Sequence, residues 1–113
     1  MNLEELRSFC QGLPTATEDI KWGHDLCFSV GQKMFCVMSL EHPTTVSFKT
    51  SDEDFALLTD TPHIIPAPYM ARHHWVQVQE LGRFTPQQWQ EYVRNSYNLI
   101  RAKLPRRMQQ ELG

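Results

Sequence analysis

Two apolar segments on either side of Gly31-Gln32 place the strongest constraint on how this chain can fold. Residues 26–30 and 33–38 are mostly apolar, and glycine in the first of two loop positions suits a type II′ turn. The sequence therefore predicts a β-hairpin. The predicted register places Val30 opposite Lys33, with Phe28 opposite Phe35.

The same register predicts a hairpin with two apolar faces. One face is expected to carry Leu26, Phe28, Val30, Phe35 and Val37. The other is expected to carry Cys27, Ser29, Met34, Cys36 and Met38. Such a hairpin is either covered on both sides or keeps one face for a protein partner or a second copy of the chain.

Capping residues predict where the first two helices begin. Asn2 and Glu5 form a capping box for a first helix that ends near Gly12. Ser51 caps a short second helix, and residues 52–54 are acidic. Acidic side chains are stabilising beside the positive end of a helix dipole, so this cluster is explained without a metal ion.

The last helix has the clearest start. Thr85 is its predicted cap, Pro86 its first residue, and Gln88 completes a capping box. An apolar stripe continues from there to Leu104, and Pro105 ends or bends the helix.

Two more segments alternate as strands, at residues 45–49 and 74–79, and the proline-rich stretch between residues 62 and 68 is expected to be a loop. The predicted fold class is therefore α+β, with an antiparallel sheet and helices on one face in a two-layer domain. One such domain is expected to span residues 1–113.

The charges are unevenly distributed along the 113 residues. Residues 1–60 contain four basic and ten acidic residues, whereas residues 61–113 contain seven basic and three acidic ones. The basic second half is a modest indication of a polyanionic partner, although the formal net charge is -2.

Other features exclude several classes of protein. Residues 1–6 lack the features of a secretory signal, and the sequence contains no apolar run long enough to span a membrane. Three cysteines do not make a disulfide framework or a zinc ribbon. We therefore expect a reduced, cytoplasmic protein.

Five short motifs, in this order and spacing, resemble the YjbR/MmcQ family of small bacterial proteins. They lie at residues 21–23, 31–35, 65–69 leading into 74–78, 96–100 and 104–107. The resemblance extends from about residue 3 to residue 108.

This resemblance implies a CyaY-like or secretion-chaperone-like fold with the order α-β-β-β-α-β-β-α, in which residues 63–65 form the fourth strand. It also implies DNA binding, which is how members are usually described. It identifies no catalytic residue, cofactor or small-molecule substrate, so we expect a protein that is not an enzyme.

DNA binding through backbone phosphates requires basic side chains, and aromatic or amide groups beside them can contact bases. The basic half of the chain supplies both, and little sequence selectivity is expected. The candidate residues are Arg72, His73, His74, Trp75, Arg94, Arg101, Lys103, Arg106 and Arg107. The alternative is a solvated helix face, a dipole-compensating helix end, and Trp75 packed in the core.

Metal binding and nucleophilic catalysis have weaker support. Adjacent histidines on a strand point to opposite faces, so His73 and His74 cannot easily share one ion. Cysteine and methionine on strands are more often core residues than ligands. A contact between Cys27 and His24 is conceivable, but the sequence has no phosphate loop, nucleophile elbow or zinc-protease motif. We expect neither a metal nor a catalytic site, and the alternative to DNA binding is a protein-interaction or chaperone-like module.

Overall fold

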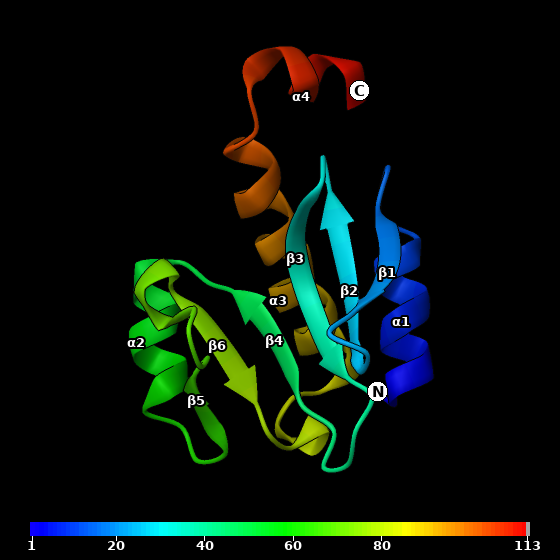
Figure 1. Ribbon diagram of the computed structural model, residues 1–113. Helices are drawn as coiled ribbons and strands as arrows, with labels where there is room; N and C mark the ends of the chain where they lie inside the picture. Colours follow the sequence, from blue (N-terminus) through cyan, green and yellow to red (C-terminus); the bar gives the residue numbers. More distant parts are fainter. Residues whose placement is uncertain (113) are drawn as a thin grey trace.

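A six-stranded antiparallel sheet forms one layer of the computed structural model, which describes residues 1–112 (Figure 1). The strands follow one another across the sheet in the order β1-β2-β3-β4-β6-β5. Their bounds are β1 (Thr17–Lys21), β2 (Asp25–Val30), β3 (Lys33–Ser39), β4 (Val46–Lys49), β5 (Ile64–Pro66) and β6 (Trp75–Val78).

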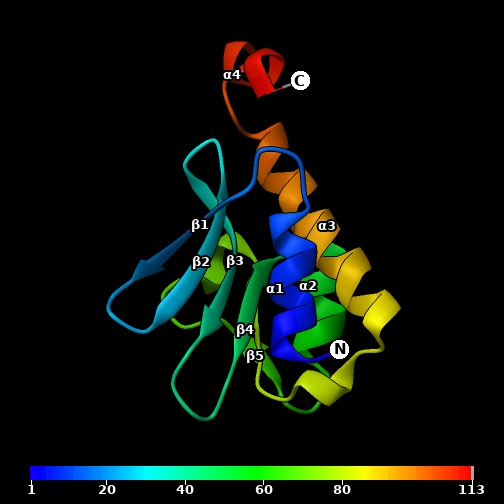
Figure 2. The ribbon, with the colours of Figure 1, turned by 90° about the vertical axis from the view of Figure 1, so that its right-hand side faces the viewer.

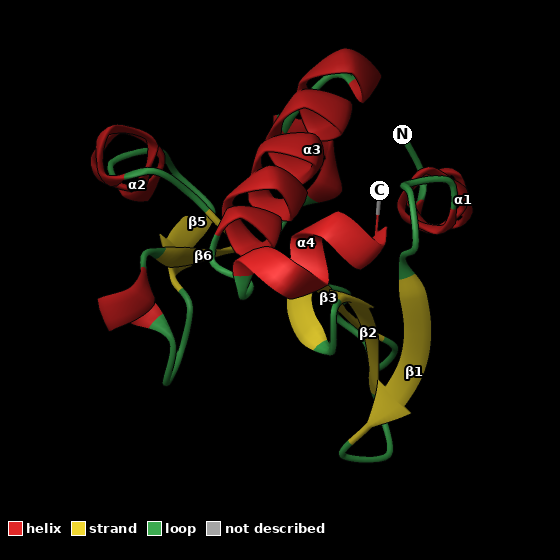
Figure 3. Cartoon of the chain, turned by 90° about the horizontal axis from the view of Figure 1, so that it is seen from above, coloured by secondary structure: helices red, strands yellow, loops and turns green. Residues whose placement is uncertain are grey.

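The helices α1 (Leu3–Gln11), α2 (Asp52–Thr59) and α3 (Pro86–Ala102) cover one face of this sheet (Figure 2). A short helix α4 (Arg106–Leu112) follows α3 and crosses above the end of the sheet (Figure 3). The fold is thus α+β, as predicted. None of the helices in residues 1–112 is both long and apolar enough to cross a membrane.

The capping residues act as predicted. The Asn2 side chain accepts a hydrogen bond from the Glu5 backbone N–H at 2.8 Å, and Glu5 accepts one from the Asn2 N–H at 3.1 Å. Thr85 and Gln88 form the equivalent pair at the start of α3. Ser51 caps α2 by accepting from the Asp54 N–H.

Two elements are missing from the predicted order. Strand β1 lies in a stretch that the sequence pattern assigns to a polar connector, and α4 follows the proline expected to end the last helix. Four of the five β1 residues are exposed, and α4 has no buried residue. Periodicity cannot detect an element that buries no stripe of apolar side chains.

The hairpin exists, but its predicted register is wrong beyond the first two residue pairs. Val30 pairs with Lys33 as expected, yet Phe28 pairs with Cys36, because Phe35 forms a β-bulge. The bulge places consecutive residues Phe35 and Cys36 in the core. The face predicted for each β3 residue after the bulge is therefore wrong: Cys36 and Met38 point into the core, and Val37 lies on the other face.

The turn type also differs from the prediction. Gly31 and Gln32 both have positive φ angles, 55° and 68°, which is the pattern of a type I′ turn. A Cβ on Gly31 would lie 2.6 Å from the Leu104 side chain. The glycine is therefore required both by the backbone conformation and by the close packing of the segment after α3.

Ser96 connects α3 to the sheet. Its buried hydroxyl donates a hydrogen bond to the Phe35 carbonyl at 2.6 Å and accepts one from the Lys49 backbone N–H at 2.9 Å. Phe35 lies in the β-bulge of β3, and Lys49 is the last residue of β4. One side chain thus bridges the bulge of β3 and the end of β4.

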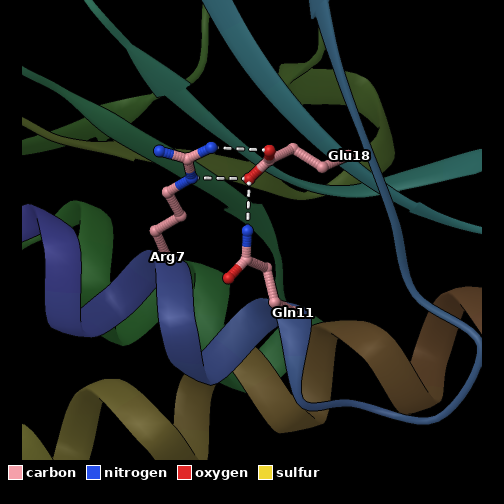
Figure 4. Close-up of polar contacts among 3 residues, drawn as sticks. All are labelled: Arg7, Gln11 and Glu18. Atoms are coloured by element: carbon pink, nitrogen blue, oxygen red, sulfur yellow. Dashed lines mark hydrogen bonds and ion pairs between the residues drawn. The ribbon is translucent and has the colours of Figure 1, made fainter.

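A polar cluster attaches α1 to the edge strand β1. Arg7 donates two hydrogen bonds to the Glu18 carboxylate, at 2.7 and 2.8 Å, and Gln11 donates a third at 3.1 Å (Figure 4). A bidentate guanidinium–carboxylate pair has fixed geometry. It therefore aligns a strand that has almost no apolar contacts of its own.

Replacing Ser96 with alanine should lower the free energy of unfolding by about 2 to 4 kcal/mol, because a buried carbonyl and a buried N–H lose their partner. The measurement is urea denaturation followed by circular dichroism. The control is Ser8→Ala on the exposed side of α1, which should change stability by less than about 0.5 kcal/mol. Equal effects of the two substitutions would contradict the role assigned to Ser96.

The Glu18 pair should make stability depend on pH. The hydrogen bonds from Arg7 lower the pKa of Glu18 below its ordinary value of 4.5. Its stabilisation is therefore complete above the unfolded-state pKa and is lost as pH falls through the lower folded-state value. The melting temperature of Glu18→Gln should be below that of the wild type at pH 7, and the gap should close in acid. A gap that stays constant as the pH falls would contradict this account.

Candidate anion-binding site

All four lysines of the chain line a single pocket of about 360 Å³. Lys21 ends β1, Lys33 begins β3, Lys49 ends β4, and Lys103 follows the last residue of α3. His73, the last residue of the 3₁₀-helix η1 (Ala71–His73), lines the same pocket. Five segments distant in sequence therefore bring basic side chains to one place.

Lys49 is the buried member of this four-lysine pocket. It is only 8% exposed, and its ammonium donates one hydrogen bond, at 2.6 Å, to the His73 backbone carbonyl. Burial is the main cause that lowers the pKa of Lys49, and the nearby positive charge of Lys103 lowers it further. The negative charge of Asp52 opposes this effect more weakly.

The wall of the pocket contains no acidic residue among residues 1–112. Besides the basic side chains, it consists of Gln32, Met34, Met70, Trp75 and Ile100. Neighbouring ammonium groups that share no carboxylate repel each other, and partial burial increases the cost of their charge. An anion in the pocket would relieve both effects, so the arrangement is chemically suited to a phosphate group.

Three of the predicted site residues lie at this pocket. Lys103 and His73 contribute exposed side chains, as DNA binding requires. Trp75 forms part of the wall but is only 3% exposed and belongs to the core. The prediction that Trp75 could stack on a base is therefore wrong, and the alternative of a core tryptophan is right.

His74 and Arg72 are close in sequence but have different roles. Strand β6 starts one residue later than predicted, because His74 has a φ of 60° and caps the C-terminal end of η1. Its Nδ1 lies 2.7 Å from Asp52, and its ring packs against Phe55. These contacts fasten η1 to α2, so His74 is explained as a structural residue, whereas Arg72 remains exposed.

The other four predicted residues do not join the pocket. Arg94 lies 5.3 Å above the Phe9 ring, between α3 and α1. Arg101 donates to the Gln109 carbonyl of α4, at 3.2 Å. Arg106 and Arg107 are exposed on α4, and Arg107 is 3.6 Å from Glu111. The nine candidates therefore do not form one surface.

Lys21, Lys33 and Lys49 are not among the predicted site residues, because all three lie in the acidic half of the chain. Strand alternation offered a signal for Lys49. Val46 and Phe48 point into the core, which places Lys49 on the opposite face of β4. Only the strand pairing shows that these lysines meet.

The surroundings of two cysteines disfavour their reactive thiolate form. A hydrogen bond with Cys10, together with burial, raises the pKa of Cys36, and burial raises the pKa of Cys27. Thiols with raised pKa values are poor nucleophiles and poor metal ligands. Cys27 donates to the Asp25 carbonyl at 3.6 Å. Within residues 1–112, no group of three His, Cys, Asp or Glu side chains is placed to hold a metal ion.

Comparison with protein families gives one match. The family model described as YjbR matches residues 11–99, which cover most of the chain and include three of the four lysines. No curated protein matches the chain.

Two solved structures are similar in fold. A crystal structure of the Deinococcus radiodurans protein DR2400, described with domain DUF419, is 27% identical and has a TM-score of 0.88. The alignment covers 99% of this chain and 88% of that one. A Pseudomonas syringae protein is 18% identical, with a TM-score of 0.74 and coverage of 88% and 99%. At that identity, the second likeness shows the fold alone.

The pocket predicts an unusual titration of Lys49. The pH midpoint of its side-chain Cε chemical shift should lie below the ordinary value of 10.5, and Lys103→Gln should raise it by removing a like charge. Added inorganic phosphate should also raise it, because an anion favours the charged ammonium. The control Lys33→Gln should have a smaller effect. A Lys49 midpoint at its ordinary value, unchanged in Lys103→Gln, would contradict the proximity of the two ammonium groups.

Proposed function

The chain belongs to the YjbR family, and from this we propose that it is a non-enzymatic protein that binds DNA through backbone phosphates at the four-lysine pocket. The observation that carries this proposal is that every lysine of the chain lines one pocket without an acidic residue in its described wall. Contacts to phosphates carry no sequence information, so the binding should have little sequence selectivity.

Two further basic residues lie outside the pocket. Arg106 and Arg107 are exposed on α4, three and four residues after Lys103. The formal net charge of -2 repels a polyanion elsewhere on the molecule, so we expect modest affinity and strong dependence on salt.

The cysteines support a non-enzymatic role in a reducing compartment. All three are free, and burial favours the neutral thiol of Cys27 and Cys36. Buried free thiols suit the bacterial cytoplasm, where DNA is also found.

The alternative of a protein-interaction or chaperone-like module has less support, because little of the apolar face that it needs is exposed. The apolar face expected for it included Cys36 and Met38, and both are fully buried against the helices because of the bulge at Phe35. Only part of the expected face, chiefly Met34, remains half-exposed beside Val37. DNA binding is therefore the function that the pocket favours.

The test is fluorescence anisotropy with a labelled DNA of mixed sequence, at salt concentrations from about 50 to 200 mM. Binding should weaken steeply with salt. Lys33→Gln and Lys103→Gln should each weaken binding for all sequences alike and lower the salt slope by about 1 per lost phosphate contact.

The matched control is Arg83→Gln, which removes an exposed positive charge from the 3₁₀-helix η2 (Leu81–Arg83), outside the pocket. It should leave the salt slope unchanged. The proposal is wrong if no binding is seen at low salt, or if Arg83→Gln weakens binding as much as the lysine substitutions.

A further inference from the structure

A second and larger hollow adjoins the four-lysine pocket. It has a volume of about 560 Å³, within the range of about 300 to 1,000 Å³ found for small-ligand sites. Val37, Ser47 and Gln77 line it, and their neighbours along β3, β4 and β6 point into the core. The groove thus lies on the sheet face opposite the helices. Figure 2 shows the helices to the right of the sheet, so this face of the sheet is on the left.

The groove and the four-lysine pocket share two wall residues. Met34 and Met70 line both of them. A ligand can therefore extend from the basic pocket into the groove without leaving the surface. Methionine is flexible and polarizable, which suits contact with flat aromatic groups.

Two exposed aromatic residues line the groove. Trp22 is 65% exposed and Tyr69 is fully exposed, whereas Trp75 and Trp89 are buried. Large aromatic side chains normally contribute most by being buried. Here two of them face solvent around one groove.

The backbone holds both aromatic residues in an unusual conformation. Trp22 has a φ of 56° and Tyr69 a φ of 67°. Positive φ is uncommon for residues other than glycine and is unfavourable for bulky ones. Such conformations concentrate at ligand-binding sites, where the surrounding structure imposes them.

We propose that the ligand is single-stranded DNA, with a base stacked on Trp22 and Tyr69 in the groove while a neighbouring phosphate occupies the four-lysine pocket. This inference rests on the proposed function and specifies its substrate. Aromatic rings that take up bases beside a basic groove are the general basis of single-strand recognition. In a duplex the bases are stacked on each other and cannot enter the groove.

The four lysines beside the groove favour this occupant over the others, and the groove wall itself contains one carboxylate, Asp25, next to His24. An apolar peptide or a second copy of the chain could cover Met34 and Val37, but neither would make use of four lysines next to the groove. A nucleotide matches both the groove and the pocket. Its base offers a flat apolar face to the aromatic rings of the groove, and its phosphate offers a negative charge to the ammonium groups of the four-lysine pocket. Ser47 and Gln77 also line the groove and offer polar atoms for base edges.

The test compares three labelled DNAs of equal length: a single strand, a duplex, and a single strand whose bases are replaced by abasic sites. Anisotropy should show tighter binding to the base-bearing single strand than to either of the others. Trp22→Ala and Tyr69→Ala should each weaken single-strand binding by about 5- to 100-fold, toward the affinity of the abasic strand. Trp22→Phe, which keeps an aromatic ring, should retain most of the binding.

Intrinsic fluorescence gives a second readout. Trp22 is the one exposed tryptophan of the chain's three, so quenching by added single-stranded DNA reports on the groove. The control Leu57→Ala changes an exposed apolar residue on α2 and should bind like the wild type. Circular dichroism should show that all variants are folded.

Different results would overturn different parts of the proposal. If binding depends on Lys33 and Lys103 but is equal for abasic and base-bearing strands and unaffected in Trp22→Ala, the base-stacking inference is wrong and the proposed function remains. If no DNA binds at low salt, both are wrong. If Trp22 becomes protected as protein concentration rises without DNA, the groove binds a second copy, and the inference is wrong.

Discussion

The hydrogen bonds of the Ser96 hydroxyl determine how the helix layer, the sheet and the lysines fit together. By binding the Phe35 carbonyl and the Lys49 N–H, Ser96 holds α3 against both β3 and β4. Lys103, the C-cap residue of α3, follows seven residues after Ser96. Since the Lys49 backbone is fixed at Ser96, the position of its side chain near Lys103 follows from this one contact.

The fold therefore brings the four lysines together, although their mutual repulsion is unfavourable for the free energy of folding. A buried ammonium group beside another positive charge is unfavourable in the free protein, as the lowered pKa of Lys49 indicates. The left-handed backbone at Trp22 and Tyr69 is also unfavourable. Thr15, His63 and His74 share this conformation outside the two hollows, so the clustered lysines, rather than the backbone alone, distinguish the site.

Local signals predicted most of the fold but not the site. The helix caps at Asn2, Ser51 and Thr85 depend on neighbouring residues and were predicted correctly. The bulge at Phe35 depends on packing between distant segments, so no local pattern indicates it. The same applies to the four lysines. They meet only because strands β1, β2, β3 and β4 lie side by side in the sheet and α3 ends beside them. The net charge of the two halves of the chain predicted a binding site in residues 61–113, whereas three of the four lysines lie in residues 1–60.

The central claim is that the four-lysine pocket binds phosphate groups of DNA. The most direct test is a titration of ¹⁵N-labelled protein with unlabelled single-stranded DNA, followed by amide chemical shifts. The account predicts the largest changes at Lys33, Lys49, His73 and Lys103, decreasing as salt is added. Changes confined to α1 and α2, or no changes at low salt, would contradict it.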